Sequence, residues 1–408
     1  MTDYDPLSNI ETASIFDVFE ALSERTDDLR EAVRRIASPP EGLRASRVFR
    51  AGDVARLLGV SERWLRNFAV DNRQVLQIQE DGFGRLYTPG DIHRIRNLAR
   101  IGPLRPAGTK ACVLAVMNFK GGSGKSSTSV ALAQSMAARG YRVLFIDMDP
   151  QGSASACFDY MHDGRLASVG ELLLDYEDTM GVLLEPAGAP EEVVATRSLS
   201  TIARKTHWET IDVIPACPAL LLCDFYGQAN QSPRSEASHS GLPGWAVRFR
   251  QLMSTITDYD VVVVDTPPAV NRSIFGVATG ADILVAPVRC AQFDIDALNA
   301  WIDVQNIWFS KIKARWYDQL KHIQLRFVLN DRSSQSGSEG KIERVVRSFY
   351  GQAVAAETIP HLEALKRGGG SAPSVFDEQP KQPHSLGTAA RKARSALNDA
   401  CDEIRALI

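Results

Sequence analysis

One stretch of this chain carries residue types that bind phosphate: residues 118–128 read N-F-K-G-G-S-G-K-S-S-T. An apolar run precedes it and an alanine-rich helical pattern follows, which is the strand–turn–helix context of a phosphate-binding loop. Glycines allow successive backbone N–H groups to converge on phosphate oxygens, and the helix adds the positive end of its dipole. Lys125 is expected to reach the β and γ phosphates, and the Ser126 hydroxyl to ligate Mg²⁺. The residues predicted to hold the nucleotide here are Gly121, Gly122, Ser123, Gly124, Lys125, Ser126 and Ser127.

The mouth of this loop departs from the common pattern. The position five residues before Gly124 is usually glycine but is Phe119 here, and Lys120 follows it. A second lysine adds positive charge where the phosphate charge would lie. The pair of lysines therefore indicates a particular branch of nucleotide-binding proteins.

Acidic residues follow two apolar runs. Four valines at 261–264 lead into Asp265, an arrangement in which a buried strand delivers a carboxylate to the Mg²⁺ shell. Asp147 and Asp149 follow the run at 143–146, where one could orient the attacking water and the other support the metal. A lone apolar run that ends in aspartate is common. The loop and both acidic runs in this order are specific, and they predict a site for ATP or GTP.

A sheet must bring these residues together. From residue 110 onward, strands are expected at 113–117, 143–146, 212–214, 261–264, 283–286, 325–329 and 355–358, alternating with helical segments. This alternation predicts an α/β fold with a doubly wound, mostly parallel sheet. Several strands end in polar or proline-rich turns, at the edge where such sheets bind ligands. Asn330 and Pro360 lie in two of these turns and are the predicted adenine contacts.

Residues 45–108 have a different pattern. A helix is expected over 53–58, Gly59 ends it, and Ser61 can cap a second helix. Trp64, Leu65 and Phe68 are expected to face inward. A turn at 81–82 between short apolar runs predicts a β-hairpin wing, and the sequence T-P-G-D at 88–91 predicts a capping box that opens a helix reaching residue 100.

Basic residues are concentrated in the same span. Its arginines outnumber its acids, although the whole chain has a formal net charge of −3. Such a local excess is the electrostatic pattern of nucleic-acid binding. The residues predicted to contact DNA are Arg63, Arg66, Asn67 and Arg85. A small helical docking domain with a solvated basic face is the alternative.

The chain divides into three expected parts: residues 1–42, 43–108 and 109–408. In the first, residues 14–36 show an apolar seam about three heptads long, which predicts either a dimerisation helix or an amphipathic helix that packs on its own domain. The 408 residues are 44% hydrophobic and 23% charged, as is usual for a soluble globular protein. The acidic N-terminus is unlike a signal peptide, and the six cysteines are scattered. We therefore expect a cytoplasmic protein.

Two resemblances emerge from these motifs. The order of elements from A-G-D-V-A-R-L-L-G-V-S-E-R-W-L-R to G-R-L-Y-T-P-G-D-I resembles the MerR-like winged helix-turn-helix. The motifs K-G-G-S-G-K-S-S-T, I-D-M-D-P-Q-G and V-V-V-V-D-T-P-P resemble those of the deviant Walker ATPases, specifically the ParA-type partition ATPases. The whole chain is similar to the larger ParA subclass, which carries an N-terminal DNA-binding domain and includes RepA proteins of repABC-type plasmids.

The second resemblance implies roles for individual residues. In that family ATP lies between two subunits, and the lysine that corresponds to Lys120 reaches the partner's phosphates. Lys125 and Ser126 match the phosphate lysine and the Mg²⁺ hydroxyl. Asp149 matches the water-activating aspartate. The metal-shell residues implied are Ser126, Asp147 and Asp265, and the catalytic residues are Lys120, Lys125 and Asp149.

The same resemblance implies partners. It predicts a homodimer with weak intrinsic ATPase activity, coating of nucleoid DNA in the ATP-bound state, and stimulation of hydrolysis by a ParB- or RepB-type centromere-binding protein. It also predicts repression of the protein's own operon through operator DNA. Lys341, Arg344 and Arg347 could line a non-specific DNA surface, or form a solvated helix face.

Two alternatives remain. One is a MerR-like transcriptional regulator whose ATPase domain senses nucleotide. The other is a MinD-like positioning ATPase, which would need a membrane-binding C-terminal helix with bulky apolar residues. The last helix instead presents small residues, which favour packing against the domain. The residues on this face are mostly alanines, namely Ala389, Ala393, Ala396 and Ala400, together with Ile404.

Overall fold

The structure is a computed structural model. It describes residues 47–76, 78–102, 108–159, 203–216, 249–250, 252–331, 336–360, 376–377 and 388–408, together with positions 14, 21, 22, 25, 28 and 374. The helix predicted at 14–36 falls almost entirely outside the described residues.

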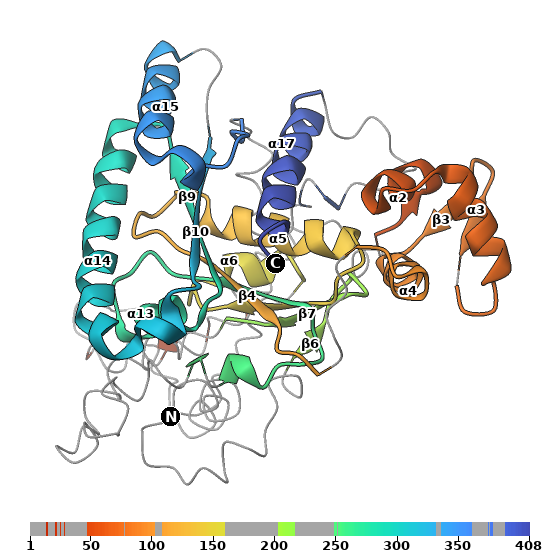
Figure 1. Cartoon of the computed structure of the whole chain (residues 1–408), viewed down its shortest axis with the longest axis horizontal. Helices are drawn as coiled ribbons and strands as arrows, with labels where there is room; N and C mark the ends of the chain where they lie inside the picture. The colour runs from red at the N-terminus through yellow and green to blue at the C-terminus, as the bar shows by residue number, and fades with distance from the viewer. Residues whose placement is uncertain are drawn as a thin grey trace, which may run out of the picture.

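A seven-stranded sheet forms the centre of the molecule (Figure 1). Its strands, in spatial order, are β10 (Gln324–Asn330), β9 (Ile283–Arg289), β4 (Cys112–Val116), β8 (Val261–Asp265), β5 (Val143–Asp147), β7 (Ile211–Ile214) and β6 (Arg204–Lys205). All neighbouring pairs are parallel except β6 with β7. The predicted mostly parallel α/β fold is therefore confirmed, and six of the seven predicted strands are present.

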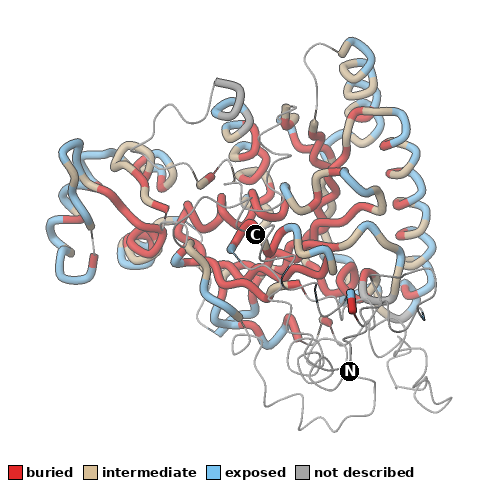
Figure 2. Tube along the Cα trace, turned by 180° about the vertical axis from the view of Figure 1, so that it is seen from behind, coloured by how far each residue is buried: buried red, intermediate tan, exposed pale blue. Residues whose placement is uncertain are grey.

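Side chains of the sheet alternate between two buried layers, as the two-residue period of a strand requires. Leu114 and Val116 face α5 (Lys125–Ala138) and α17 (Thr388–Arg405), whereas Val113 and Ala115 face α13 (Arg272–Gly280) and α14 (Gln292–Leu320). Because both faces are covered, the inner strands β4, β8 and β5 are buried along almost their whole length, whereas the edge strand β6 is exposed (Figure 2). Such strands read as continuous valine and isoleucine runs in the sequence.

The N-terminal unit, residues 47–102, is small and has its own sheet, which is not hydrogen-bonded to the seven-stranded sheet. Its strands β1 (Phe49–Arg50), β3 (Gly84–Tyr87) and β2 (Gln79–Asp81) form an antiparallel sheet in that order. The helices are α2 (Ala51–Leu58), α3 (Glu62–Asp71) and α4 (Pro89–Ala99). The two predicted caps are confirmed: the Ser61 hydroxyl accepts the Trp64 N–H at 3.1 Å, and Thr88 and Asp91 form a reciprocal capping box.

This unit packs directly on the sheet domain. Ile92 and Ile95 of α4 belong to the same buried cluster as Ala137 and Tyr141, at the C-terminal end of α5. His93 Nδ1 lies 2.8 Å from the Gly140 carbonyl oxygen. α5 therefore runs from the phosphate-binding loop at its N-terminus to the N-terminal unit at its C-terminus.

The structure corrects three details of the sequence prediction. Trp64 is 36% exposed and stacks on Phe68 with ring centroids 4.8 Å apart, because Leu65 and not Trp64 packs into the core. The hairpin turn is formed by Gly82 and Phe83, one residue later than expected. At 355–358 there is no strand among the described residues: a single bridge pairs Val354 with Phe327.

The last described helix packs as its small residues predicted. Ala400 and Ile404 of α17 are buried against α5, and the Cys401 thiol lies 4.0 Å from the Ala131 carbonyl oxygen. No helix in the described part of the chain has the length and apolar character needed to cross a membrane.

Candidate functional site

The loop between β4 and α5 has the backbone that a phosphate cradle needs. Gly122 and Gly124 have φ angles of 73° and 87°, in the left-handed region that favours glycine. Gly124 also lies against Asn330: a Cβ atom there would be 2.5 Å from the Asn330 Nδ2. A larger residue at this position would therefore both strain the backbone and push on its neighbour.

Lys125 is withdrawn from water at the start of α5. It is 5% exposed, and its Nζ donates to the Lys120 carbonyl oxygen at 3.0 Å. Burial lowers the pKa of Lys125, while the carboxylates of Asp265 and Asp149 oppose this shift. A poorly solvated ammonium group gains more from meeting phosphate oxygens than one in bulk water.

Asp147 and Asp265 lie side by side at the ends of β5 and β8, where they are paired in register. The Asp147 carboxylate accepts hydrogen bonds from the Asp149 N–H at 3.0 Å and from the Ser155 N–H and hydroxyl at 2.8 and 2.7 Å. The oxygens of Asp265 are fully buried and have no hydrogen-bond partner among the described residues. Burial raises the pKa of both carboxyl groups, and the charge of Asp147 raises the pKa of Asp265 further.

These residues fit a Mg²⁺–nucleotide complex in part. Buried carboxylate oxygens without partners are costly, so those of Asp265 are suited to a cation or to its bound water. The Ser126 and Ser129 hydroxyls, in the first turns of α5, lie near enough to lower the pKa of Asp265 against the larger effect of burial, although neither meets the geometry of a hydrogen bond. Asp147 already accepts three hydrogen bonds and suits an indirect role. No group of three or more His, Cys, Asp or Glu side chains in the described ranges forms a metal site by itself, which is usual where phosphates supply ligands.

Asp149 lies at the mouth of the site. It is 9% exposed, and its Oδ1 accepts the Gln151 N–H at 3.0 Å. This bond to its own turn engages only one of the two carboxylate oxygens. Asp149 lies near enough to Lys125 to affect the pKa of that ammonium group.

Lys120 is held on the other side of the loop. Its Nζ lies 2.5 Å from the Oδ2 of Asp294, in the first turn of α14. Its N–H donates to the Asn118 Oδ1 at 3.0 Å, and the Asn118 amide donates to the Pro287 carbonyl oxygen at 2.9 Å. Lys120 thus points toward α14 and away from Lys125.

The two predicted adenine contacts meet at the end of β10. Asn330 is 5% exposed and donates to the Ser123 carbonyl oxygen at 2.7 Å, so it braces the phosphate-binding loop. The Ile359 N–H donates to the Leu329 carbonyl oxygen at 2.8 Å, which places Pro360 at the same edge of the sheet. Asn330 Oδ1 is buried without a hydrogen-bond partner in the described part of the chain.

The predicted DNA contacts divide into two groups. Arg63, Arg66 and Asn67 are exposed on α3. Arg85 is partly buried: its Nε donates to Glu80 at 2.9 Å and its Nη1 to the Arg66 carbonyl oxygen at 3.1 Å. Arg85 thus fastens the hairpin to α3. Arg347 likewise points inward, since it donates to the Ala355 carbonyl oxygen and to Thr358, whereas Lys341 and Arg344 are exposed.

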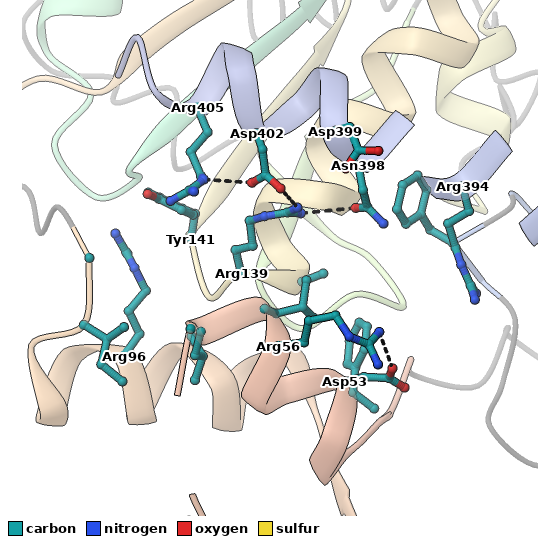
Figure 3. Close-up of a pocket in the computed structure, with 18 of the residues that line it drawn as sticks. Asp53, Arg56, Arg96, Arg139, Tyr141, Arg394, Asn398, Asp399, Asp402 and Arg405 are labelled. Atoms are coloured by element: carbon teal, nitrogen blue, oxygen red, sulfur yellow. Dashed lines mark hydrogen bonds and ion pairs between the residues drawn. The ribbon is translucent and has the colours of Figure 1, made fainter. Parts of the chain in front are cut away.

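A cavity of about 490 Å³ lies between the N-terminal unit, the end of α5 and α17 (Figure 3). Charged side chains cross-link its walls. Arg139 donates to Asp402 at 2.6 Å, Arg405 donates to the other oxygen of Asp402 at 3.1 Å, and the Arg96 guanidinium lies 3.7 Å from the centroid of the Tyr141 ring. These contacts tie α4, α5 and α17 together.

The sequence analysis did not identify two residues that position side chains of the predicted nucleotide site. Asp294 and Ser155 fix Lys120 and Asp147, yet each lies in a different element from the residue it fixes. Asp294 had a weak signal, since it is an acid in the first turn after a strand that ends at the ligand edge. Ser155 had none.

Comparison with known proteins agrees with this geometry. Residues 111–315 match the family model described as AAA domain. The chain is 28% identical to the putative replication protein A of Rhizobium rhizogenes, over 91% of this chain and 89% of the relative. It is 27% identical to the protein SopA of Escherichia coli K12, over 90% and 89% respectively. A solved structure described as a partition protein shares the fold with a TM-score of 0.60 and 15% identity, over 97% of this chain and 99% of that one.

Proposed function

The chain belongs to the AAA-domain family and resembles the ParA- and SopA-type P-loop ATPases over about nine-tenths of its length, and on this premise we propose that it is a DNA-partition ATPase. In this proposal it binds ATP with Mg²⁺, dimerises around the nucleotide and hydrolyses ATP slowly by itself. A centromere-binding protein of the ParB or RepB type accelerates the hydrolysis. The protein works in the cytoplasm on nucleoid DNA.

The loop residues bind the phosphates. Backbone N–H groups from Gly121 to Ser127 surround them, and Lys125 meets the β and γ phosphates with an ammonium group that burial has already stripped of water. Ser126 and Asp265 would hold Mg²⁺, and Asp147 would support them through its hydrogen bonds. The metal supplies neutralisation of the phosphate charge.

Two residues prepare the attack on the γ phosphate. Asp149, at the mouth of the site, orients the water with the oxygen that its own turn does not engage. Lys120 leaves Asp294 and meets the phosphates of the partner subunit, which makes hydrolysis depend on dimerisation. A cationic group supplied in this way can be worth roughly 10³ to 10⁵ in rate.

The N-terminal unit binds DNA and represses the protein's own operon. It holds ten arginines and six acidic residues between positions 47 and 102, in a chain whose net charge is −3. α3 presents Arg63, Arg66 and Asn67 to solvent, and the hairpin lies beside it through Arg85. A basic helix next to a hairpin is the arrangement that a winged helix-turn-helix uses in DNA.

One observation carries the proposal: Lys125, Asp147, Asp149 and Asp265 meet at the end of α5, whose other end carries the N-terminal unit. The test measures ATP hydrolysis with and without DNA and the centromere-binding protein. We expect acceleration in the wild type and none in Lys120→Ala, which should still bind ATP. A wild-type rate that neither addition changes would contradict partition and favour a nucleotide-sensing regulator.

A further inference from the structure

The tip of the hairpin between β2 and β3 carries an exposed aromatic ring. Phe83 is 89% exposed, more than any other large hydrophobic residue in the part of the chain that the structure describes. A single exposed hydrophobic residue is common on protein surfaces. The residues around Phe83 therefore decide whether this exposed ring has a function.

The turn under Phe83 is built by hydrogen bonds. The Asp81 Oδ1 accepts the Phe83 N–H at 2.9 Å, and Arg50 donates to both Asp81 oxygens at 2.7 and 2.9 Å. The Arg50 guanidinium also lies 5.9 Å from the centroid of the Phe83 ring. Gly84 completes the turn with a φ of 122°. The ring is thus presented from a defined turn, so ordering it on contact costs little entropy.

The hairpin that carries Phe83 is fixed beside α3. Arg85 Nη1 donates to the Arg66 carbonyl oxygen at 3.1 Å, which fixes the hairpin against α3. α3 and β3 lie at the end of the molecule farthest from α14 (Figure 1). Phe83 therefore belongs to a hairpin that is fixed beside α3, in the unit that packs on the opposite end of α5 from the phosphate-binding loop.

The charges around Phe83 favour DNA as the molecule that this ring contacts. The hairpin has two acids that would repel phosphate, but Arg50 pairs with Asp81 at 2.7 Å and Arg85 pairs with Glu80 at 2.9 Å. Its tip is therefore electrically balanced and apolar, while the adjacent helix α3 is basic. A neutral apolar tip gains nothing from a phosphate oxygen, but it can enter a groove and meet the faces of bases.

We propose that Phe83 is a wedge that enters the minor groove beside α3 and unstacks one base step of the bound DNA. This inference rests on the proposed DNA binding by the N-terminal unit. Apolar side chains used in this way open a base step and bend the duplex toward the major groove. A winged unit whose helix lies in the major groove has its hairpin next to the adjoining minor groove. The wedge would make sequence preference at that step depend on how easily it unstacks.

The experiment uses the full-length protein and DNA that the wild type selects from random-sequence duplexes. 2-Aminopurine, whose fluorescence rises when it unstacks, is placed at each base step in turn. We expect the wild type to raise the fluorescence at one step. Phe83→Ala should abolish this rise and weaken binding about tenfold, whereas Phe83→Leu should keep most of both. Leu98→Ala removes another accessible apolar side chain, on α4 and 51% exposed, and should change neither.

The possible failures are distinct. Tight wild-type binding without a fluorescence rise at any step, or a rise that persists in Phe83→Ala, would overturn the wedge and leave DNA binding standing. A Phe83→Ala variant that keeps the rise but changes the molar mass in light scattering would assign Phe83 to a protein contact and overturn the wedge. If the wild type selects no sequence, this result would contradict DNA binding by the N-terminal unit and therefore also the wedge.

Discussion

Lys120 and Asp294 form an ion pair with an Nζ–Oδ2 distance of 2.5 Å, within one subunit. The Asp294 side chain is 6% exposed and that of Lys120 is 30% exposed, so the pair is partly shielded from water. The lysine assigned to the partner's phosphates is therefore already occupied before dimerisation. In the proposed ATP-bound dimer, release of Lys120 from Asp294 is a cost that the contacts of the dimer must offset.

The first prediction follows from this cost. Asp294→Asn removes the charge that holds Lys120 while keeping the size of the side chain. We expect dimerisation with a non-hydrolysable ATP analogue to tighten by about thirtyfold, since each of the two subunits is spared the loss of a partly exposed ion pair worth about 1 kcal/mol. Sedimentation velocity measures the dimer constant. Asp318→Asn, at the other end of α14, breaks an exposed pair with Lys321 and is the matched control. Equal constants for Asp294→Asn and wild type would contradict a restraining role.

The second prediction concerns α3. Arg63→Ala and Arg66→Ala should weaken operator binding, and each phosphate ion pair removed should lower the slope of log affinity against log salt by about one unit. Nucleotide binding should not change, because these side chains lie on the exposed face of a separate unit. Titrations between about 50 and 200 mM salt give the slopes. Lys313→Ala removes an exposed positive charge on α14, outside the N-terminal unit, and serves as the control. Operator affinity that is independent of salt in the wild type would disprove phosphate binding by α3.

The third prediction concerns Gly140, where α4 meets α5. Its φ is 79°, and a Cβ atom would lie 3.0 Å from the Ile92 carbonyl oxygen and 3.1 Å from the His93 Cα. Gly140→Ala therefore combines left-handed strain with a backbone clash. We expect a loss of about 2–4 kcal/mol of stability, and faster hydrogen exchange in α4.

Gly59 separates the two causes. Its φ is 69°, but an added Cβ atom would meet nothing within 4 Å. Gly59→Ala should therefore show the strain alone, about 1 kcal/mol. If both variants lose the same stability in thermal unfolding, the close approach of α4 to Gly140 contributes nothing.

The fourth prediction is a pH dependence. His207 Nδ1 lies 3.1 Å from Asp159 and its Nε2 lies 3.1 Å from Asp377, which also accepts the Trp208 indole N–H at 2.9 Å. Burial alone would lower the pKa of His207, but the two carboxylates outweigh it and raise the pKa to about 8. The protonated histidine thus joins residue 377 to the edge of the sheet.

The sign follows from linkage. The pKa of His207 in the folded state lies above the ordinary value of about 6.5. The stabilisation of the folded state by protonated His207 is therefore complete below about pH 6.5 and is lost as the pH rises through about 8. It amounts to about 2 kcal/mol. The difference in thermal midpoint between wild type and His207→Gln should shrink from pH 6 to 9. His322→Gln, at an exposed position, should show no such change. A difference that stays constant over this range would contradict a raised pKa for His207 that is lost near pH 8.

Sequence alone determined the fold class and the acidic residues at the carboxyl ends of β5 and β8. Valine runs such as 261–264 are strands buried on both faces, and their polar ends must meet at one edge of a parallel sheet. This is why Lys125, Asp147 and Asp265 could be grouped before any contact was known. The caps at Ser61 and Thr88 were also predictable, because a cap is a local hydrogen bond between residues three positions apart.

Tertiary structure decided what depends on contacts between distant segments. The partner of Lys120 lies 174 positions away in Asp294, and Arg85 is drawn from the predicted DNA surface by the Arg66 carbonyl oxygen. Trp64 turned outward because packing of Leu65 set the phase of α3, which hydrophobicity alone does not fix. A motif names the side chains available to a site. Only packing determines which of them are already bound to one another, and therefore which remain for a ligand.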